Sequence, residues 1–263
     1  MNKPIGIFDS GVGGLTVAAQ IMKKLPNENL LYFGDAARFP FGTKTAEELI
    51  QYTFEIVEYM QKQDVKLVVI ACNSASAAAL EKAQEEFDIP IVGVVEPGAR
   101  AAVLASVNRH IGVIGTEATI KSEAYKKAIH LFDAGAQVFS AACPSFAAFV
   151  ENGYTDGDHI DEIAQQYLEP LRKQQIDSLI LGCTHYPLLS GVIQKVMGGA
   201  VRMISSAEET ALEVKEILMR KSQLRVEIAP AYRFLSTGDS SKFTKLGTRF
   251  LGHQIEAVEA VEL

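Results

Sequence analysis

Short apolar runs that alternate with helix-like segments constrain this chain more than any other feature. These runs recur at residues 5–8, 30–33, 67–71, 91–95, 111–114, 137–140 and 179–181. Such alternation is typical of βαβ units, in which a helix connects two parallel strands. The chain is therefore predicted to be an α/β protein with parallel sheets.

Two pairs of these runs are similar to each other. Residues 5–10 (IGIFDS) are echoed by residues 111–116 (IGVIGT), and residues 67–74 (LVVIACNS) by residues 178–185 (SLILGCTH). The second echo aligns Cys72 with Cys183. Chance similarity between buried apolar strands is the alternative explanation. The pattern predicts two similar α/β halves, each with a thiol at the end of an inner strand.

The segment that follows Thr45 carries the start signal of a helix. Thr45 and Glu48 have the spacing of a capping box, in which each residue satisfies a backbone N–H of the other. Ile50, Phe54 and Val57 then recur at helical spacing as an apolar stripe. An amphipathic helix is expected here.

Charge and cysteine content narrow the class of protein. The chain has 25 Lys and Arg against 32 Asp and Glu, a net charge of −7, and no dense basic run, so no nucleic-acid partner is expected. No stretch approaches the ~20 apolar residues that span a bilayer, so we expect a cytoplasmic protein without a membrane partner. The 3 widely spaced cysteines argue against a disulfide framework or a structural zinc site. We therefore expect reduced thiols and a small-molecule substrate.

Cys72 and Cys183 each follow an apolar run and precede a predicted helix start. Both are expected at the carboxyl ends of strands, where α/β sheets bind ligands. A helix N-terminus favours a thiolate, so the pKa of each thiol is expected to fall from about 8.5 toward neutrality. Two facing thiols can remove a proton from one side of a carbon and return one to the other, which inverts a stereocentre.

Other uses of the cysteines remain open at this point. A single cysteine at a strand end is more often a buried apolar residue. One nucleophilic cysteine with a histidine base would suit acyl transfer, but it leaves the second cysteine unexplained. Cys143 has no hydroxyl or histidine beside it and is expected to be structural.

The loop of residues 9–14 (DSGVGG) follows the first predicted strand. It resembles a phosphate-binding loop, but Thr16 replaces the last glycine of the dinucleotide fingerprint and no Walker lysine follows. Asp9 suits a substrate ammonium group and Ser10 a carboxylate, so an amino acid fits better than a nucleotide. The alternative role of Asp9 is a helix N-cap.

Three further places carry candidate residues. His185 shares a loop with Cys183 and can bind a substrate or tune the thiol. The backbone of Phe41 and Gly42 can approach a ligand closely because glycine has no side chain, although a plain turn is the alternative. Glu151 is either an ordinary exposed acid or a residue that tunes a base.

The chain resembles the glutamate racemase family of the Asp/Glu racemase superfamily. The motifs that carry this resemblance are residues 6–15 (GIFDSGVGGL), 32–42, 71–75 (ACNSA), 92–98 (VGVVEPG) and 181–187 (LGCTHYP). In this resemblance Phe41 stands where the family usually has Tyr, and Ser74 where it usually has Thr. A side-chain contact at residue 41 would therefore lack a hydroxyl, whereas Ser74 keeps one.

The resemblance implies an isomerase that interconverts L- and D-glutamate without a cofactor or metal and supplies D-glutamate for peptidoglycan. It implies that Cys72 acts on the D-isomer and Cys183 on the L-isomer. The remaining implied residues are substrate contacts and two supporting acids: Asp9, Ser10, Phe41, Gly42, Asn73, Ser74, Thr184 and His185, with Asp35 and Glu151 in support.

The resemblance also implies two similar flavodoxin-like parallel-sheet domains with the active site at their interface. One domain would comprise residues 1–93 and 208–263, and the other residues 94–207. A homodimer is expected from the same resemblance. The alternatives are an aspartate or broad-specificity amino-acid racemase of the superfamily, and a non-catalytic amino-acid-binding module.

Overall fold

The computed structural model describes residues 2–227 and 229–263, and the strands of these residues form two parallel sheets. The first sheet has the order β10-β9-β2-β1-β3-β4, and the second has the order β6-β5-β7-β8. The strands of the first sheet are β1 (Ile5–Asp9), β2 (Leu30–Gly34), β3 (Leu67–Ile70), β4 (Ile91–Gly93), β9 (Tyr232–Ser236) and β10 (Glu259–Ala260). Those of the second are β5 (His110–Gly115), β6 (Gln137–Ala142), β7 (Ser178–Gly182) and β8 (Arg202–Ile204). The predicted α/β class with parallel sheets is confirmed.

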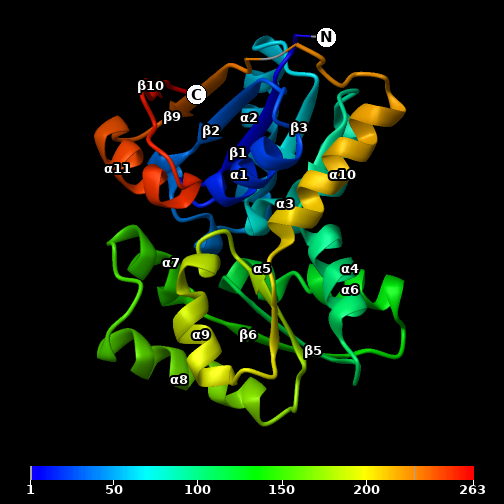
Figure 1. Cartoon of the computed structure of the whole chain (residues 1–263), viewed down its shortest axis with the longest axis vertical. Coiled ribbons are helices and arrows are strands. Elements are labelled where there is room, and N and C mark those ends of the chain that lie inside the picture. The colour runs from blue at the N-terminus through cyan, green and yellow to red at the C-terminus, as the bar shows by residue number, and fades with distance from the viewer. Residues whose placement is uncertain (1, 228) are drawn as a thin grey trace.

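Helices cover both faces of each sheet (Figure 1). Around the first sheet, one side carries α1 (Leu15–Lys24), α10 (Ser206–Arg220) and α11 (Ser240–Leu251), and the other carries α2 (Ala46–Lys62) and α3 (Asn73–Glu86). Around the second, one side carries α4 (Val95–Ala105) and α6 (Ala124–Phe132), and the other carries α7 (Pro144–Glu151), α8 (Asp158–Arg172) and α9 (Ser190–Met197). Three short elements are η1 (Ala36–Arg38), η2 (Phe41–Thr43) and η3 (Tyr186–Leu189), and α5 (Glu117–Lys121) contacts η2.

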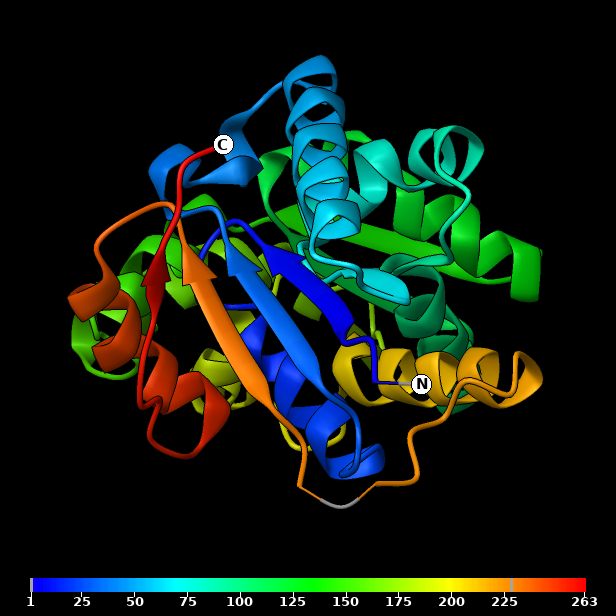
Figure 2. The ribbon, with the colours of Figure 1, turned by 90° about the horizontal axis from the view of Figure 1, so that it is seen from above.

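The two sheets repeat one strand order. The order β2-β1-β3-β4 in the first sheet matches β6-β5-β7-β8 in the second, so β1 corresponds to β5 and β3 to β7. This is the beginning of the flavodoxin order. The first sheet is extended by β9 and β10, which lie beyond β2 (Figure 2). The repeat inferred from the two sequence echoes is therefore present in the fold, while the domain bounds stay a prediction.

Burial on both faces explains why the strands are continuous apolar runs. In β1, Ile5 and Ile7 pack into the core cluster that includes α1, whereas Phe8 packs into the cluster on the side of α2. The first of these clusters continues from the first sheet into the α7–α9 side of the second. The two halves thus share one apolar core, which fixes the ends of their strands relative to each other.

The capping box at the start of α2 is confirmed. The Glu48 backbone N–H donates to Thr45 Oγ1 at 3.2 Å, and the Thr45 N–H donates to Glu48 Oε2 at 2.8 Å. The helix then runs from Ala46 to Lys62.

The predicted stripe on α2 is only partly correct. Val57 is fully buried as expected, but Ile50 and Phe54 are only half-buried, and the rest of the fully buried face is formed by Leu49, Ile56 and Met60. Because the helix has apolar residues on two adjacent lines, the sequence pattern did not distinguish the line at the core from the line at its edge.

Some strands differ from the sequence expectation. The run at 91–95 is a strand only to Gly93, because Val95 begins α4. Strands β8, β9 and β10 were not predicted. Strands β8 and β10 have three residues or fewer, which is too short for a clear apolar run. Strand β9 has the half-polar sequence YRFLS, and its place in the sheet depends on pairing with the distant strand β2.

A buried ion pair ties the amino ends of the first sheet to the segment between α10 and β9. Lys66 Nζ lies 2.5 Å from Glu28 Oε2, and both side chains are at most 3% exposed. Lys66 also donates to the Gln223 carbonyl at 2.8 Å, and the Arg225 N–H donates to Glu28 Oε1 at 2.8 Å. These contacts hold the connection that returns the chain to the first sheet.

No helix within residues 2–227 and 229–263 is long and apolar enough to cross a membrane.

Candidate active site

A small cavity lies where the carboxyl ends of β3 and β7 face each other. It receives side chains from both sheets, including the two cysteines. Its lining residues are Ser10, Phe39, Pro40, Phe41, Gly42, Cys72, Asn73, Ser74, Thr116, Ala147, Cys183, Thr184 and His185. The cavity is thus lined by nine of the ten residues expected as substrate contacts or reacting thiols, and Asp9 is the exception.

Cys72 lies at the N-cap of α3, two residues after β3, and is 6% exposed. Burial, together with the charge of Asp9, raises the pKa of its thiol to about 12. Backbone N–H groups of Ala75 and Ser74 act in the opposite direction. The expectation that the helix N-terminus would bring this pKa toward neutrality is wrong, because desolvation of the thiolate outweighs the helix.

Cys183 follows β7 directly and is paired with His185. The distance from Cys183 Sγ to His185 Nδ1 is 3.8 Å, and His185 Nε2 lies 2.9 Å from Glu151 Oε1. The imidazole ring also packs between Phe39 and Phe250, with centroid distances of 5.8 and 5.4 Å. The ring is therefore held by polar partners at both nitrogens and by apolar groups on its sides.

His185 is a charged imidazolium at neutral pH. Burial lowers its pKa, but hydrogen bonds to Cys183 and Glu151 and the charge of Asp9 raise it by more, to about 10. Lys242 Nζ lies 3.8 Å from the other oxygen of Glu151. The arrangement places a positive charge beside the sulfur of Cys183, whereas no cation within residues 2–227 and 229–263 is a cause of the pKa shift of Cys72.

The raised pKa of His185 leads to a pH-dependent stability. Its folded pKa of about 10 exceeds its ordinary value of 6.5, so its contribution is complete below about pH 6.5 and is lost as the pH rises through 10. We expect His185→Asn to lower the free energy of unfolding by ~4 kcal/mol more at pH 6.5 than at pH 10. Urea unfolding of both proteins at the two pH values measures this, and an equal difference at both would contradict it.

Asp9 lies behind the cavity and does not line it. Its side chain is fully buried, accepts the Thr184 hydroxyl at 3.3 Å and accepts the Gly11 N–H at 3.2 Å. Burial raises the pKa of this carboxyl. The N-cap of α1 is Gly14, so Asp9 is not the cap of that helix. Asp9 therefore connects the first loop to the loop of Cys183, and its charge acts on the thiol of Cys72.

The first loop and the His185 loop approach closely at Gly13. A Cβ added there would lie 2.4 Å from Thr184 Oγ1 and 2.6 Å from His185 Cε1, which is too close for any side chain. A glycine is required at this position because the two loops meet there.

Asn73 and Ser74 form the first turn of α3 and contact the second sheet's half. Ser74 Oγ lies 2.8 Å from Thr116 Oγ1, and the Tyr125 hydroxyl donates to Asn73 Oδ1 at 2.6 Å. The loop of Phe41 and Gly42 also packs against Thr116, since a Cβ on Gly42 would lie 2.5 Å from Thr116 Cβ. Neither Thr116 nor Tyr125 was predicted to belong to the site.

A signal for Thr116 was present in the first echo. Ser10 lines the cavity after β1, and Thr116 is its counterpart after β5. Tyr125 has no such signal, because it lies within α6 and does not follow a strand.

Asp35 and Glu151 do not line the cavity but support residues that do. Asp35 is buried, accepts Arg38 Nε at 2.5 Å and accepts the Thr237 hydroxyl at 2.8 Å. The Arg38 guanidinium lies 4.1 Å from the centre of the Tyr52 ring, and that ring packs against Phe41. Asp35 thus fixes the loop that carries Phe41.

Cys143 is fully buried at the N-cap of α7, and its Sγ lies 3.9 Å from the Ala141 carbonyl. It is absent from the cavity lining. Its surroundings fit the structural role expected for it. All three cysteines are free thiols.

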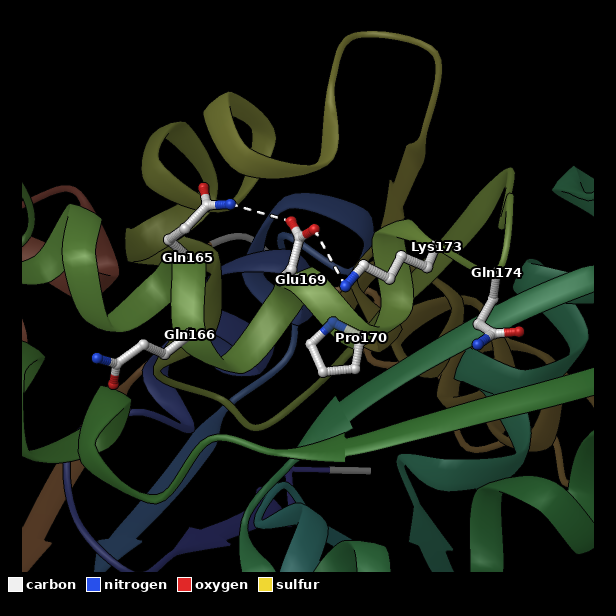
Figure 3. A pocket seen from close by; sticks show the side chains of 6 residues that line it. All are labelled: Gln165, Gln166, Glu169, Pro170, Lys173 and Gln174. Carbon is white, nitrogen blue, oxygen red and sulfur yellow. Dashed lines mark hydrogen bonds and ion pairs between the residues drawn. The ribbon is translucent and has the colours of Figure 1, made fainter.

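A second hollow lies on the outer surface of α8 (Figure 3). Gln165 donates to Glu169 at 3.0 Å, and Lys173 Nζ lies 3.6 Å from the same carboxylate. The lining residues are mostly exposed and paired along one helix, without a cysteine or histidine among them. This is a solvated helix face and not a reaction site.

Within the residues that the structure describes, no group of three or more His, Cys, Asp or Glu side chains is arranged to hold a metal ion.

The geometry and the comparisons with known proteins define an amino-acid racemase, an isomerase. A family model described as Asp/Glu/Hydantoin racemase matches residues 15–214. A glutamate racemase of Corynebacterium diphtheriae is 50% identical over 261 residues, which cover 98% of this chain and 97% of that protein. The chain therefore belongs to the Asp/Glu/Hydantoin racemase family.

Solved structures agree with this assignment. Glutamate racemase isoform RacE1 from Bacillus anthracis is 47% identical, with a TM-score of 0.96 and coverage of 99% of this chain and 98% of that one. The glutamate racemase of Francisella tularensis in complex with D-glutamate is 35% identical, with a TM-score of 0.93 and the same coverage. The resemblance to glutamate racemases inferred from the sequence motifs is confirmed.

Proposed function

We propose that this chain interconverts L- and D-glutamate through two thiols that act on opposite sides of the α-carbon. The observation that carries this proposal is the single cavity lined by one cysteine from the end of β3 and one from the end of β7. Relatives that are about half identical over nearly the full length are glutamate racemases, and one solved relative holds D-glutamate. These findings favour glutamate over aspartate as the substrate.

The two thiols have different surroundings, which suit different roles in the proposed reaction. The raised pKa of Cys72 keeps it a protonated acid before substrate binds. Cys183 faces the charged imidazolium of His185, which can donate a hydrogen bond to a sulfur anion. With L-glutamate bound, Cys183 as a thiolate removes the α-proton, and Cys72 as a thiol delivers its own proton to the opposite face. The reverse reaction exchanges the two roles.

Between the two proton transfers, negative charge develops on the α-carboxylate as the carbon becomes planar. Hydrogen-bond donors from Asn73, Ser74 and Thr184 surround the cavity and can stabilise this charge. The nearly closed site excludes water, which strengthens these hydrogen bonds. Proton transfer therefore needs no electron-withdrawing cofactor under this proposal.

The cellular role is part of the same proposal. D-Glutamate made here would supply peptidoglycan synthesis in the cytoplasm, where thiols remain reduced. A homodimer is the proposed assembly.

The purified protein, without added cofactor, is expected to convert either enantiomer of glutamate to the racemate. In heavy water it is expected to incorporate deuterium at Cα, because the returned proton comes from a thiol that exchanges with solvent. Chiral chromatography and mass spectrometry measure both results. Binding of glutamate without α-proton exchange would contradict a racemase, and a higher kcat/KM for aspartate would contradict the choice of glutamate.

A further inference from the structure

Tyr125 makes a contact that the proposed reaction does not yet use. It lies on α6, beside the second sheet, and is 2% exposed. Its hydroxyl donates to Asn73 Oδ1 at 2.6 Å, across the boundary between the two halves of the molecule. Tyr125 itself is absent from the cavity lining, whereas Asn73 is part of it. The phenol therefore acts on the site only through Asn73.

The side-chain amide of Asn73 has two ends with opposite hydrogen-bonding character. Its oxygen accepts and its nitrogen donates. A carboxylate in the cavity can use only the donor end, and the oxygen would repel it. The phenol O–H donates to this oxygen, so the amide nitrogen is the end that faces away from Tyr125. With the amide reversed, the nitrogen would donate to the phenol oxygen, the phenol hydrogen would lose this acceptor, and the amide oxygen would face the carboxylate.

We propose that Tyr125 is a positioning residue that holds the Asn73 amide with its nitrogen toward the substrate carboxylate. This inference rests on the proposed function, since it assumes that a carboxylate binds in the cavity. Charge develops on that carboxylate during proton transfer, so a fixed donor stabilises the transition state more than the bound substrate. The contact also makes the donor available only when the halves carrying α3 and α6 are correctly packed together.

Tyr125→Phe removes the hydroxyl and keeps the ring. We expect kcat/KM for glutamate to fall about 10-fold to 100-fold, with most of the loss in kcat. In an Asn73→Ala background the same change is expected to have less than about a two-fold effect, because the amide that it orients is gone. Kinetics give kcat/KM for the parent, the two single variants and the double variant. Calorimetry gives the Kd of each for D-glutamate, so that a variant too slow for kinetics still gives a value.

Tyr167→Phe is the matched control. Tyr167 lies on α8 and does not line the cavity. Its hydroxyl lies 3.0 Å from Ser145 Oγ, so it too has a hydroxyl partner to lose. Both Tyr→Phe variants should lower the thermal unfolding midpoint slightly, but only Tyr125→Phe should lower kcat/KM. A purely structural role predicts parallel changes in both variants.

The outcomes separate this inference from the proposed function. A parent protein that fails to exchange the α-proton of glutamate overturns the proposed function. A parent that exchanges it, with Tyr125→Phe within two-fold of parental kcat/KM, overturns the inference alone. An equal effect of Tyr125→Phe with and without the Asn73 amide overturns it as well.

Discussion

Cys72→Ala and Cys183→Ala are each expected to lower the rate of glutamate racemisation by at least about 10²-fold to 10⁴-fold in both directions. This is the range expected for removal of one general acid or base. Under the proposed mechanism each variant lacks the group on one face of the α-carbon, so neither enantiomer can complete the exchange of one proton for another. Polarimetry from each pure enantiomer measures the loss.

Cys143→Ala is the matched control for the two cysteine variants. Cys143 is as buried as the other two thiols but is absent from the cavity lining, so its variant should keep the parental rate within about three-fold. Parental activity in either Cys72→Ala or Cys183→Ala would disprove the two-thiol mechanism. Equal losses in all three variants would indicate a general effect of core cysteines on folding.

Glu28→Gln is expected to lower the free energy of unfolding by about 3–5 kcal/mol. The substitution leaves the Lys66 ammonium buried without its charge partner, which is costly because the surrounding medium solvates ions poorly. The double variant Glu28→Gln/Lys66→Met is expected to be more stable than Glu28→Gln, since it removes the uncompensated charge. Urea unfolding at neutral pH measures all three proteins.

A surface ion pair of equal length provides the comparison. Lys3 Nζ lies 2.5 Å from Asp64 Oδ1, but the two side chains are 55% and 73% exposed. Lys3→Ala is therefore expected to cost less than about 1 kcal/mol. A loss below 1 kcal/mol for Glu28→Gln would show that the buried pair is solvated in solution and does not anchor the segment before β9.

Much of the fold was predictable because its signals are local. Short apolar runs revealed seven strands, all but β6 buried on both faces, and Thr45 with Glu48 revealed the start of α2. The cysteine echo located two strand ends that meet at one cavity. Strand β9 was not predictable in this way, since it is defined by pairing with β2 about 200 residues earlier in the chain.

The parts of the site that escaped prediction depend on packing. The helix position of Cys72 was correct, yet its burial decides the pKa, and burial is a property of the whole fold. Tyr125 is an ordinary residue of an amphipathic helix in sequence, and its contact with Asn73 exists only because α6 and α3 are brought together. Local patterns thus indicated the reacting groups more readily than the groups that orient them.

The repeated strand order has a consequence for the energetics of the reaction. Enantiomers have equal free energies in water, so the equilibrium constant is one and kcat/KM must be equal in the two directions. The two halves differ around their thiols, since His185 lies beside Cys183 and is the only histidine among the described residues that line the cavity. A difference of this kind can change how tightly each enantiomer is held and how fast it turns over at saturation. Where it changes only the binding of one enantiomer, kcat and KM for that enantiomer change by a common factor, and in every case the ratio of the two specificity constants stays fixed at one.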